Sequence, residues 1–225
     1  MDGEFLTDFI SHFGLALSAL LPLINPLGSA LFFVGLVGPA PPEVYRRLAR
    51  KIAFTTTLFL LAIDAVGTAT LKFFGISLGV MQVSGGLVLA AMEWGLLNQS
   101  QPQAQNRPEF EDTDLASLEN QVFYPFTFPV TAGPGCVVVM ITLSAHASRE
   151  GGLAHVSAHS GIALAIVLLS VAVYVCYGYA PVITARVRPQ TAHGILRVVA
   201  FVLMCIGVQI TWNGVEALLT PLLRR

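Results

Sequence analysis

Six long apolar segments follow one another along the chain, separated by short polar stretches. They span roughly residues 8–37, 48–72, 74–95, 121–147, 155–182 and 194–219. A helix needs about 20 apolar residues to cross a bilayer, so each segment is long enough to span a membrane. The pattern predicts an all-α membrane protein with six transmembrane helices.

The first and fourth segments are interrupted by proline and glycine. Residues 21–28 read Leu-Pro-Leu-Ile-Asn-Pro-Leu-Gly, and residues 128–135 read Phe-Pro-Val-Thr-Ala-Gly-Pro-Gly. A proline inside a helix destabilises it by about 3 kcal/mol, and lipid offers no water to the freed backbone groups. Such breaks persist where the backbone packs inside protein or lines a cavity, and two in corresponding places indicate a transport site. We therefore expect spans 1 and 4 to be discontinuous.

A polar stretch between the third and fourth spans divides the chain into two halves. Residues 1–97 hold spans 1–3, residues 98–120 form an acidic linker that we expect to be mobile, and residues 121–225 hold spans 4–6. With three spans in each half, the second half must run upside down relative to the first. This arrangement predicts two inverted three-helix repeats, the plan of many secondary transporters.

Composition agrees with the membrane class. Only 11% of the residues are charged, whereas soluble domains carry about 25%. The net charge of −1 gives no electrostatic case for nucleic-acid binding. The three cysteines and five histidines show no metal or redox spacing, so we expect neither a metal nor a cofactor. The acidic start Met1-Asp2-Gly3-Glu4 is not that of a signal peptide, so we expect the first span to be retained.

The distribution of Lys and Arg predicts the orientation in the membrane. Eight of these residues fall on the linker side of the six spans and four on the side of the termini. Positive loops favour the cytoplasm. The bias therefore predicts a cytoplasmic linker and both termini outside. The linker-side residues are Arg46, Arg47, Arg50, Lys51, Arg107, Arg186, Arg188 and Arg197, and the others are Lys72, Arg149, Arg224 and Arg225.

Each break has the residues of a half-helix start. Asn25-Pro26 reads as an N-cap followed by proline at the first helical position, and Gly133-Pro134 is similar. Unpaired N–H groups at such starts attract anions, while carbonyls at the preceding half-helix ends attract cations, so the pair suits a zwitterion such as an amino acid. Kinks sealed by neighbouring helices are the alternative interpretation. The predicted substrate site comprises Asn25, Pro26, Leu27, Gly28, Ser29, Thr131, Gly133, Pro134, Gly135 and Cys136.

Two carboxylates within spans are candidates for ion coupling. Asp64 lies in the middle of span 2 and Glu93 near the linker-side end of span 3. Acids inside the membrane are expensive and mark ion pathways by default, so we consider both for H⁺ or Na⁺. A buried Asp64 that is merely hydrogen-bonded to a threonine is an open alternative. Small residues, among them Gly85, Gly86, Gly95, Gly207 and Gly214, would let spans 3 and 6 pack closely.

Several of these motifs together resemble the MarC family of bacterial inner-membrane proteins. They are Pro22 with Asn25-Pro26-Leu27-Gly28, Phe74-Gly75-Ile76-Ser77, Ser84-Gly85-Gly86-Leu87 and the segment from Tyr124-Pro125-Phe126 through Pro129 to Gly133-Pro134-Gly135. The family is also called the neutral amino acid transporter family, and it contains members that move glycine and alanine. The resemblance implies an inverted-repeat transporter in the bacterial inner membrane with its site at the two breaks.

Other classes of protein fit the sequence less well. Asn25-Pro26-Leu27 is similar to the Asn-Pro-Ala of aquaporins, but the second half offers Gly-Pro-Gly, and the motifs interrupt the first span of each half. A hydrolase needs a nucleophile with a base in reach, and no convincing pair is found, so we expect no enzyme activity. We predict a secondary transporter of small neutral amino acids that works by alternating access. The alternatives are a small-solute channel and a membrane assembly protein.

Overall fold

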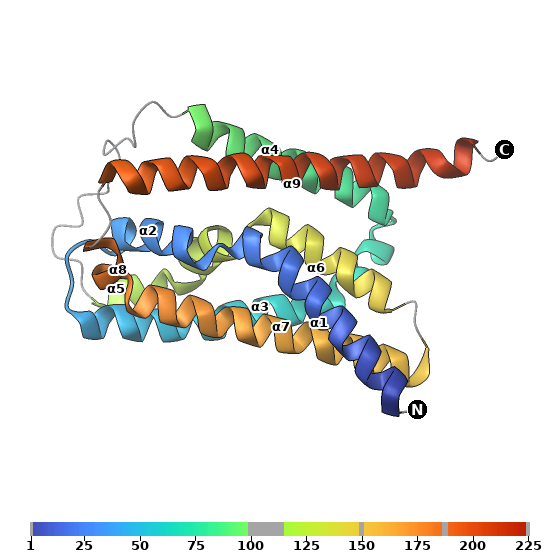
Figure 1. The fold of residues 1–225 in the computed structure, drawn as a ribbon, viewed down its shortest axis with the longest axis horizontal. Coiled ribbons are helices and arrows are strands. Elements are labelled where there is room, and N and C mark those ends of the chain that lie inside the picture. The colour runs from blue at the N-terminus through green and yellow to red at the C-terminus, as the bar shows by residue number, and fades with distance from the viewer. Residues whose placement is uncertain (1, 99–114, 149–150, 186–188, 224–225) are drawn as a thin grey trace.

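The computed structural model describes residues 2–98, 115–148, 151–185 and 189–223, and all regular structure within these ranges is helical (Figure 1). The first half of the chain forms α1 (Asp2–Ile24), α2 (Pro26–Val37), α3 (Pro42–Phe73) and α4 (Leu78–Asn98). The second half forms α5 (Leu115–Asn120), the π-helical segment η1 (Val122–Thr131), α6 (Pro134–Ala147), α7 (Gly152–Gly178), α8 (Ala180–Ala185) and α9 (Pro189–Leu223).

The prediction of an all-α membrane protein is confirmed. Five stretches are long and apolar enough to cross a bilayer: Phe5–Val37, Pro42–Phe73, Leu78–Asn98, Gly152–Gly178 and Gly194–Thr220. A sixth crossing exists if Val122–Thr131 and Pro134–Ala147, which are bent by 73° at their junction, count as one span. Helix α3 begins at Pro42 rather than near residue 48, because its basic first turns extend the helix beyond the apolar stretch that the sequence pattern detects.

The helices run between two ends of the molecule. The N-terminus, the C-terminus, the end of α3 and the start of α4 lie at one end, on the right of Figure 1, which we call the termini end. The start of α3, the end of α4 and the start of α9 lie at the opposite end, which we call the linker end. Of the predicted linker, residues 99–114 lie outside the described residues, and Leu115–Asn120 form α5.

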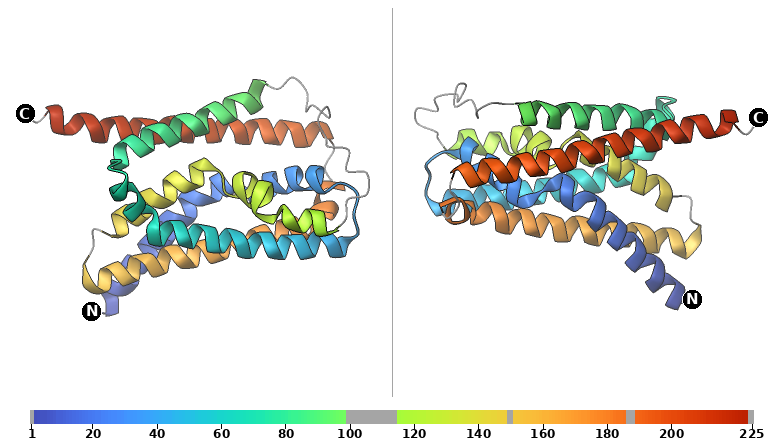
Figure 2. Two further views of the ribbon diagram at one scale, coloured as in Figure 1. Left: turned by 180° about the vertical axis from the view of Figure 1, so that it is seen from behind. Right: turned by 45° about the horizontal axis from the view of Figure 1, so that its top comes forward.

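Helices α4 and α9 form a closely packed pair along one side of the molecule, and α4 also contacts α6 (Figures 1 and 2). Their backbones touch at two glycine pairs. A Cβ atom at Gly86 would lie 2.5 Å from the carbonyl oxygen of Gly207, and one at Gly214 would lie 2.6 Å from that of Gly79. Small residues let helices approach this closely in lipid, where van der Waals packing drives association.

The remaining long helices, α1, α3, α6 and α7, pack together with α2 and η1 around the buried core. An aromatic cluster ties several of these elements to one another. The ring of Phe33 on α2 stacks on that of Tyr177 on α7 at 4.5 Å between centroids, and meets Tyr45 and Phe126 edge-on at 5.7 and 5.5 Å. All four side chains are nearly or completely buried, so the cluster joins α2, α3, η1 and α7 in the core.

The short helix α5 is held against the first turns of α3 by charge. The carboxylate of Glu119 lies 2.7 Å from Nζ of Lys51 and 2.5 Å from Nε of Arg47. The hydrogen bond from Lys51, together with the charges of both cations, lowers the pKa of Glu119 below its ordinary value. The stabilisation from these ion pairs is therefore present at neutral pH and is lost as the pH falls through that lowered pKa.

Candidate functional site

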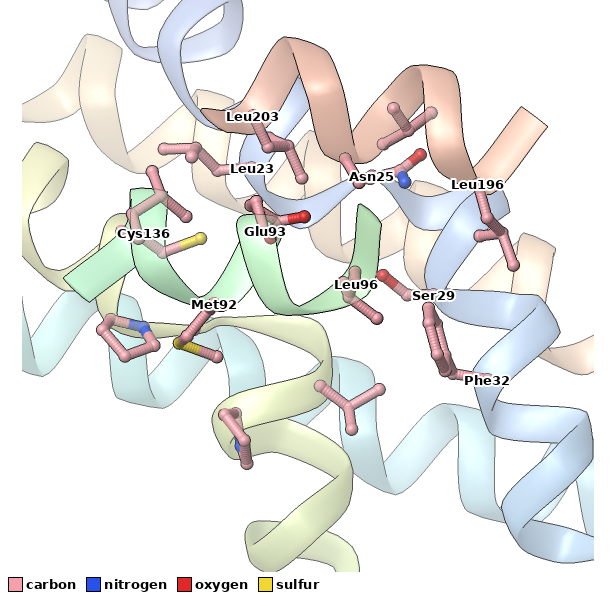
Figure 3. Close-up of a pocket in the computed structure, with 18 of the residues that line it drawn as sticks. Leu23, Asn25, Ser29, Phe32, Met92, Glu93, Leu96, Cys136, Leu196 and Leu203 are labelled. Carbon is pink, nitrogen blue, oxygen red and sulfur yellow. The ribbon is translucent and has the colours of Figure 1, made fainter. Parts of the chain in front are cut away.

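A cavity of about 1090 Å³ lies between the α4–α9 pair and the two breaks (Figure 3). Its wall is formed by residues around the α1–α2 junction, the η1–α6 junction, the second half of α4 and the first half of α9. The lining extends to Leu96 and Gly194, near the ends of α4 and α9 at the linker end. Six predicted site residues line it: Asn25, Ser29, Gly133, Pro134, Gly135 and Cys136.

The first break is a single residue wide. Asn25 has the left-handed conformation, with φ 41° and ψ 66°, and its Oδ1 accepts a hydrogen bond from the N–H of Gly28 at 3.2 Å. The predicted N-cap, with Pro26 at the first helical position, is thereby confirmed. The hydroxyl of Ser29 donates to the carbonyl oxygen of Ile24 at 2.6 Å, across the break. Side chains thus satisfy backbone groups that the break sets free.

The other predicted residues of the first break lie outside the cavity lining. Pro26 and Gly28 are buried, and Leu27 is 61% exposed. A Cβ atom at Gly28 would lie 2.0 Å from Nδ2 of Asn25. Gly28 therefore leaves the room in which the Asn25 side chain folds back onto the helix start.

The second break is wider, and η1 bends by 73° into α6. Tyr124 and Phe128 have extended backbones, with ψ angles of 125° and 126°, because each precedes a proline, which disfavours the helical region. Thr131 is fully buried and does not line the cavity. Its hydroxyl donates to the carbonyl oxygen of Phe126 at 2.6 Å and lies 2.9 Å from the hydroxyl of Tyr177.

Most of the N–H groups at the two half-helix starts already have acceptors within the protein. The N–H of Ser29 donates to the carbonyl oxygen of Asn25 at 2.9 Å, and that of Cys136 to the carbonyl oxygen of Gly133 at 3.0 Å. The N–H of Gly28 donates to Asn25 Oδ1 as described above. For Gly135, at the start of α6, no such acceptor is present among the described residues. Among the residues that line the cavity, Gly135 thus has an N–H group at a helix start that is available to a ligand.

Two charged side chains of opposite sign also line the cavity. Glu93 on α4 is 8% exposed, and Arg197 on α9 is exposed. The oxygen atoms of Glu93, Asn25 and Ser29 lie on the wall of the cavity (Figure 3). From the sequence, Glu93 is a candidate for ion coupling, whereas Arg197 counts only towards the predicted orientation. An arginine inside an apolar span is itself a signal for a functional site, and this signal would have found Arg197.

Asp64, the second predicted coupling residue, lies outside the cavity. It is 8% exposed on α3, a helix that contributes no residue to the cavity lining. Its Oδ2 lies 2.9 Å from Nδ1 of His159 on α7. The side-chain partner of Asp64 is therefore a histidine and not the threonine that the sequence suggested. Within the described residues, no group of three or more His, Cys, Asp or Glu side chains could hold a metal ion.

These features define a polytopic helical membrane protein whose main cavity is built at two helix breaks. Residues 10–219 match the family described as MarC family integral membrane protein, and the chain therefore belongs to the MarC family. It is 30% identical over 218 residues to the UPF0056 inner membrane protein MarC of Salmonella paratyphi B, covering 93% of this chain and 96% of that protein.

Two further relatives cover nearly the whole chain. A UPF0056 membrane protein of Methanocaldococcus jannaschii is 26% identical over 213 residues, which is 94% of this chain and 90% of the relative. The MarC protein of an Escherichia coli O1:K1 strain is 27% identical over 216 residues, with 93% and 96% covered. No solved structure matches the chain. Together with the apolar helices, these relatives identify a multi-pass protein of the inner membrane.

Proposed function

We propose that this protein is a secondary transporter of small neutral amino acids that works by alternating access around the cavity. One observation carries the proposal: a single cavity collects both helix breaks, one buried carboxylate and one guanidinium. Charged groups inside a membrane protein are expensive and are kept where a substrate or ion needs them. A zwitterion offers its ammonium group to the carboxylate and its carboxylate to the guanidinium.

The chemistry of the wall fits an amino acid in a defined orientation. The guanidinium of Arg197 and the N–H of Gly135 bind the α-carboxylate, because Arg holds carboxylates through paired, charge-assisted hydrogen bonds. The carboxylate of Glu93 binds the α-ammonium group, with Asn25 and Ser29 as neutral polar neighbours. The rest of the wall is largely apolar, with Leu23, Leu89 and Met92 among its residues, which favours a side chain without charge.

The proposal includes two inverted repeats with discontinuous first spans. In Figure 1, α4 runs from the termini end to the linker end, and its counterpart α9 runs the opposite way. The same reversal holds for α3 and α7, the second spans of the two halves. Glycines seven residues apart in α4 (Gly79 and Gly86) meet glycines seven residues apart in α9 (Gly214 and Gly207). Corresponding elements of the two halves therefore pack on each other in antiparallel pairs, which supports this plan.

The position of the cavity supports a conformation that is accessible from one side. Its lining reaches the linker end, whereas the residues of α4 before Leu89 and of α6 after Cys136 do not take part. With the linker in the cytoplasm and both termini outside, this is the inward-facing state of the transporter. Transport then requires the termini end to open while the linker end closes.

Counterflow in proteoliposomes tests the proposal. Vesicles that contain purified protein and unlabelled glycine or alanine are diluted into labelled substrate, and the label is expected to accumulate transiently. A channel gives no such overshoot. Glu93→Gln is expected to lower exchange at least about tenfold, because a hydrogen bond to a charged group contributes about 1.5–3 kcal/mol. Glu216→Gln is the matched control, since Glu216 is exposed on α9 and does not line the cavity.

Two results would contradict the proposal. Folded wild-type protein that exchanges neither glycine nor alanine would remove the substrate class. Equal exchange by wild type and Glu93→Gln would remove the zwitterion site as described.

A further inference from the structure

Outside the cavity, Asp64 on α3 and His159 on α7 form a largely buried pair of titratable side chains. Their side chains are 9% and 21% exposed, and Oδ2 of Asp64 lies 2.9 Å from Nδ1 of His159. The other carboxylate oxygen, Oδ1, is buried and has no hydrogen-bond partner within the described structure. A buried carboxylate with one unused oxygen is costly, and such groups in membrane proteins mark ion pathways.

The pair has a connection to the surface at the termini end. If Nδ1 of His159 carries the hydrogen that it donates to Asp64, Nε2 is left as a proton acceptor. Nε2 lies 3.4 Å from the hydroxyl of Ser148, an exposed residue, and the ring of the exposed His155 lies 4.5 Å from that of His159. A proton from this side can therefore reach Nε2 without crossing the core.

Other titratable groups occur on the elements around the pair, but none of them has a described contact with Asp64. His146 on α6 bonds through Nδ1 to the carbonyl oxygen of Thr142. His12 on α1 bonds to the carbonyl oxygen of Asp8 on the same helix, and Lys72 is the charged residue further along α3. Arg149 and Glu150, which follow Ser148, lie outside the described residues. His159 is thus the group positioned to share a proton with Asp64.

Helix α6 links this pair to the cavity. The hydroxyl of Ser144 on α6 donates to the carbonyl oxygen of Asp64 at 2.7 Å. One turn further along α3, a Cβ atom at Gly67 would lie 2.6 Å from Cγ1 of Ile141 on α6, so the two helices are in close contact there. The same α6 begins at Pro134 and contributes Gly135 and Cys136 to the cavity. A change in the α3–α6–α7 packing therefore reaches the substrate site through one helix.

We propose that Asp64 and His159 together form a proton-binding site that transport uses. Before the site binds a proton, neutral His159 donates from Nδ1 to the Asp64 carboxylate, and the pair carries one negative charge. When a proton adds to Nε2, the pair becomes an imidazolium and a carboxylate with no net charge, which holds α3 and α7 together at the termini end. Opening of this end separates the two groups and favours release of the proton. This inference rests on the proposed transport function.

Ser148, His159 and Asp64 are also arranged in the order of a Ser-His-Asp catalytic triad. The distance of 3.4 Å between Ser148 Oγ and His159 Nε2 is longer than the range of about 2.6–3.2 Å for an activated nucleophile. A proton path needs only an exposed hydroxyl or water at this position, so the geometry favours proton binding over nucleophilic catalysis.

Proteoliposome transport tests the pair in two modes. The first is glycine counterflow at equal pH on both sides, and the second is glycine uptake driven by a proton gradient, with a pH dye inside the vesicles. Asp64→Asn and His159→Gln are expected to keep counterflow but to lose at least about tenfold of the gradient-driven uptake and of the glycine-dependent pH change. His146→Gln, the same replacement at a histidine without a described bond to Asp64, is expected to behave like wild type.

Gradient-driven uptake at the wild-type level in both Asp64→Asn and His159→Gln would overturn the proposal, and so would a wild type in which a gradient drives no uptake although counterflow proceeds.

A second measurement separates this inference from the transport proposal. Histidine side-chain nitrogens are labelled with ¹⁵N, and their NMR signals are followed against pH in wild type and in the same variants. The signal that disappears in His159→Gln is expected to change its pH dependence in Asp64→Asn, and the signal that disappears in His146→Gln is expected not to. If wild type shows no counterflow but this linkage is found, the transport function fails and the proton site stands. If Asp64→Asn leaves the His159 signal unchanged at every pH, the proton site fails whatever the transport result.

Discussion

Asn25 combines two properties that few residues offer together. Its backbone is left-handed, with φ 41°, and its side chain accepts the hydrogen bond from Gly28 at the start of α2. Asparagine tolerates this backbone region better than other residues with a Cβ, because its short polar side chain bonds locally. Its amide also lies on the cavity wall. One residue therefore stops α1, starts α2 and presents a polar group to the site.

The left-handed backbone predicts an inverted order of stability for two substitutions at this position. Asn25→Gly loses the cap but adopts this φ without strain, because glycine has no Cβ. Asn25→Ala also loses the cap but keeps a Cβ, which costs about 1–2 kcal/mol in the left-handed region. We expect Asn25→Ala to be less stable than Asn25→Gly by about 1 kcal/mol, the reverse of the order in an ordinary helix. Thermal unfolding in detergent measures the difference.

Asn213 provides the control for this comparison. It lies inside α9 and is exposed, and its Oδ1 accepts a hydrogen bond from Gln209 on the same helix. There Asn213→Ala is expected to be more stable than Asn213→Gly. The same order at both positions would show that Asn25 does not require the left-handed conformation.

At the level of helices, the α4–α9 pair fixes the distance between the two charged groups of the cavity. Gly86 lies seven residues before Glu93 on α4, and it meets Gly207, which follows Arg197 on α9. Backbone atoms cannot move aside as a flexible side chain can, so the close approach at Gly86 and Gly207 depends on the missing side chains. The separation of Glu93 and Arg197 therefore depends on these glycines.

Enlarging this contact is expected to damage both stability and transport. In Gly86→Val the new Cβ would lie 2.5 Å from the carbonyl oxygen of Gly207, and overpacking of this kind typically destabilises by about 1–3 kcal/mol. Gly95→Val is the control on the same helix, because a Cβ at Gly95 meets nothing within 4 Å. Unfolding temperature and glycine counterflow are measured for both variants. Equal losses in the two would contradict the glycine contact as the cause.

The sequence indicated most of the elements but few of their contacts. Apolar length identifies the spans because the bilayer sets it, and Asn25-Pro26 identifies a helix start because capping is local. Which helix faces pack against each other is not determined by the local sequence. Gly86 contacts α9, whereas a Cβ at the adjacent Gly85 would meet Val138 on α6, and a Cβ at Gly95 would meet nothing within 4 Å. All three glycines looked alike in the sequence.

The candidate site shows the same limit. The proline and glycine breaks predicted the residues around which the cavity forms, because such breaks need protein neighbours in a membrane. The partner of Asp64 could not be predicted, because His159 lies 95 positions away on a helix that is apolar on most of its faces. The sequence also does not reveal that the N–H groups of Ser29 and Cys136, at the two half-helix starts, donate to the main-chain carbonyls of Asn25 and Gly133 instead of being unpaired.

At the scale of the whole molecule, the two ends differ in how they are closed. The cavity lining reaches the linker end. Towards the termini end, polar bonds join neighbouring helices: Ser144 to Asp64, Asp64 to His159, and Ser157 on α7 to the carbonyl oxygen of Phe5 on α1. In the proposed transport cycle these bonds towards the termini end must break, and the Asp64–His159 pair is the one among them that protonation can change.

The basic first turns of α3 carry much of the charge bias that predicts how these ends are oriented in the membrane. Arg46, Arg47, Arg50 and Lys51 supply four of the eight Lys and Arg residues on the linker side, against four on the side of the termini. We expect a C-terminal fusion of the wild type to alkaline phosphatase to be active and one to green fluorescent protein to be dark, because the charge bias predicts a C-terminus outside. Replacing all four basic residues with Gln leaves four against four, and both fusions are then expected to report a mixture of orientations.

Because these replacements also remove the partners of Glu119, Glu119→Gln serves as the control: it removes the same ion pairs, keeps the Lys and Arg count and is expected to retain the wild-type orientation. A fluorescent wild-type fusion would instead place the linker outside, and the cavity would then face the exterior in this conformation.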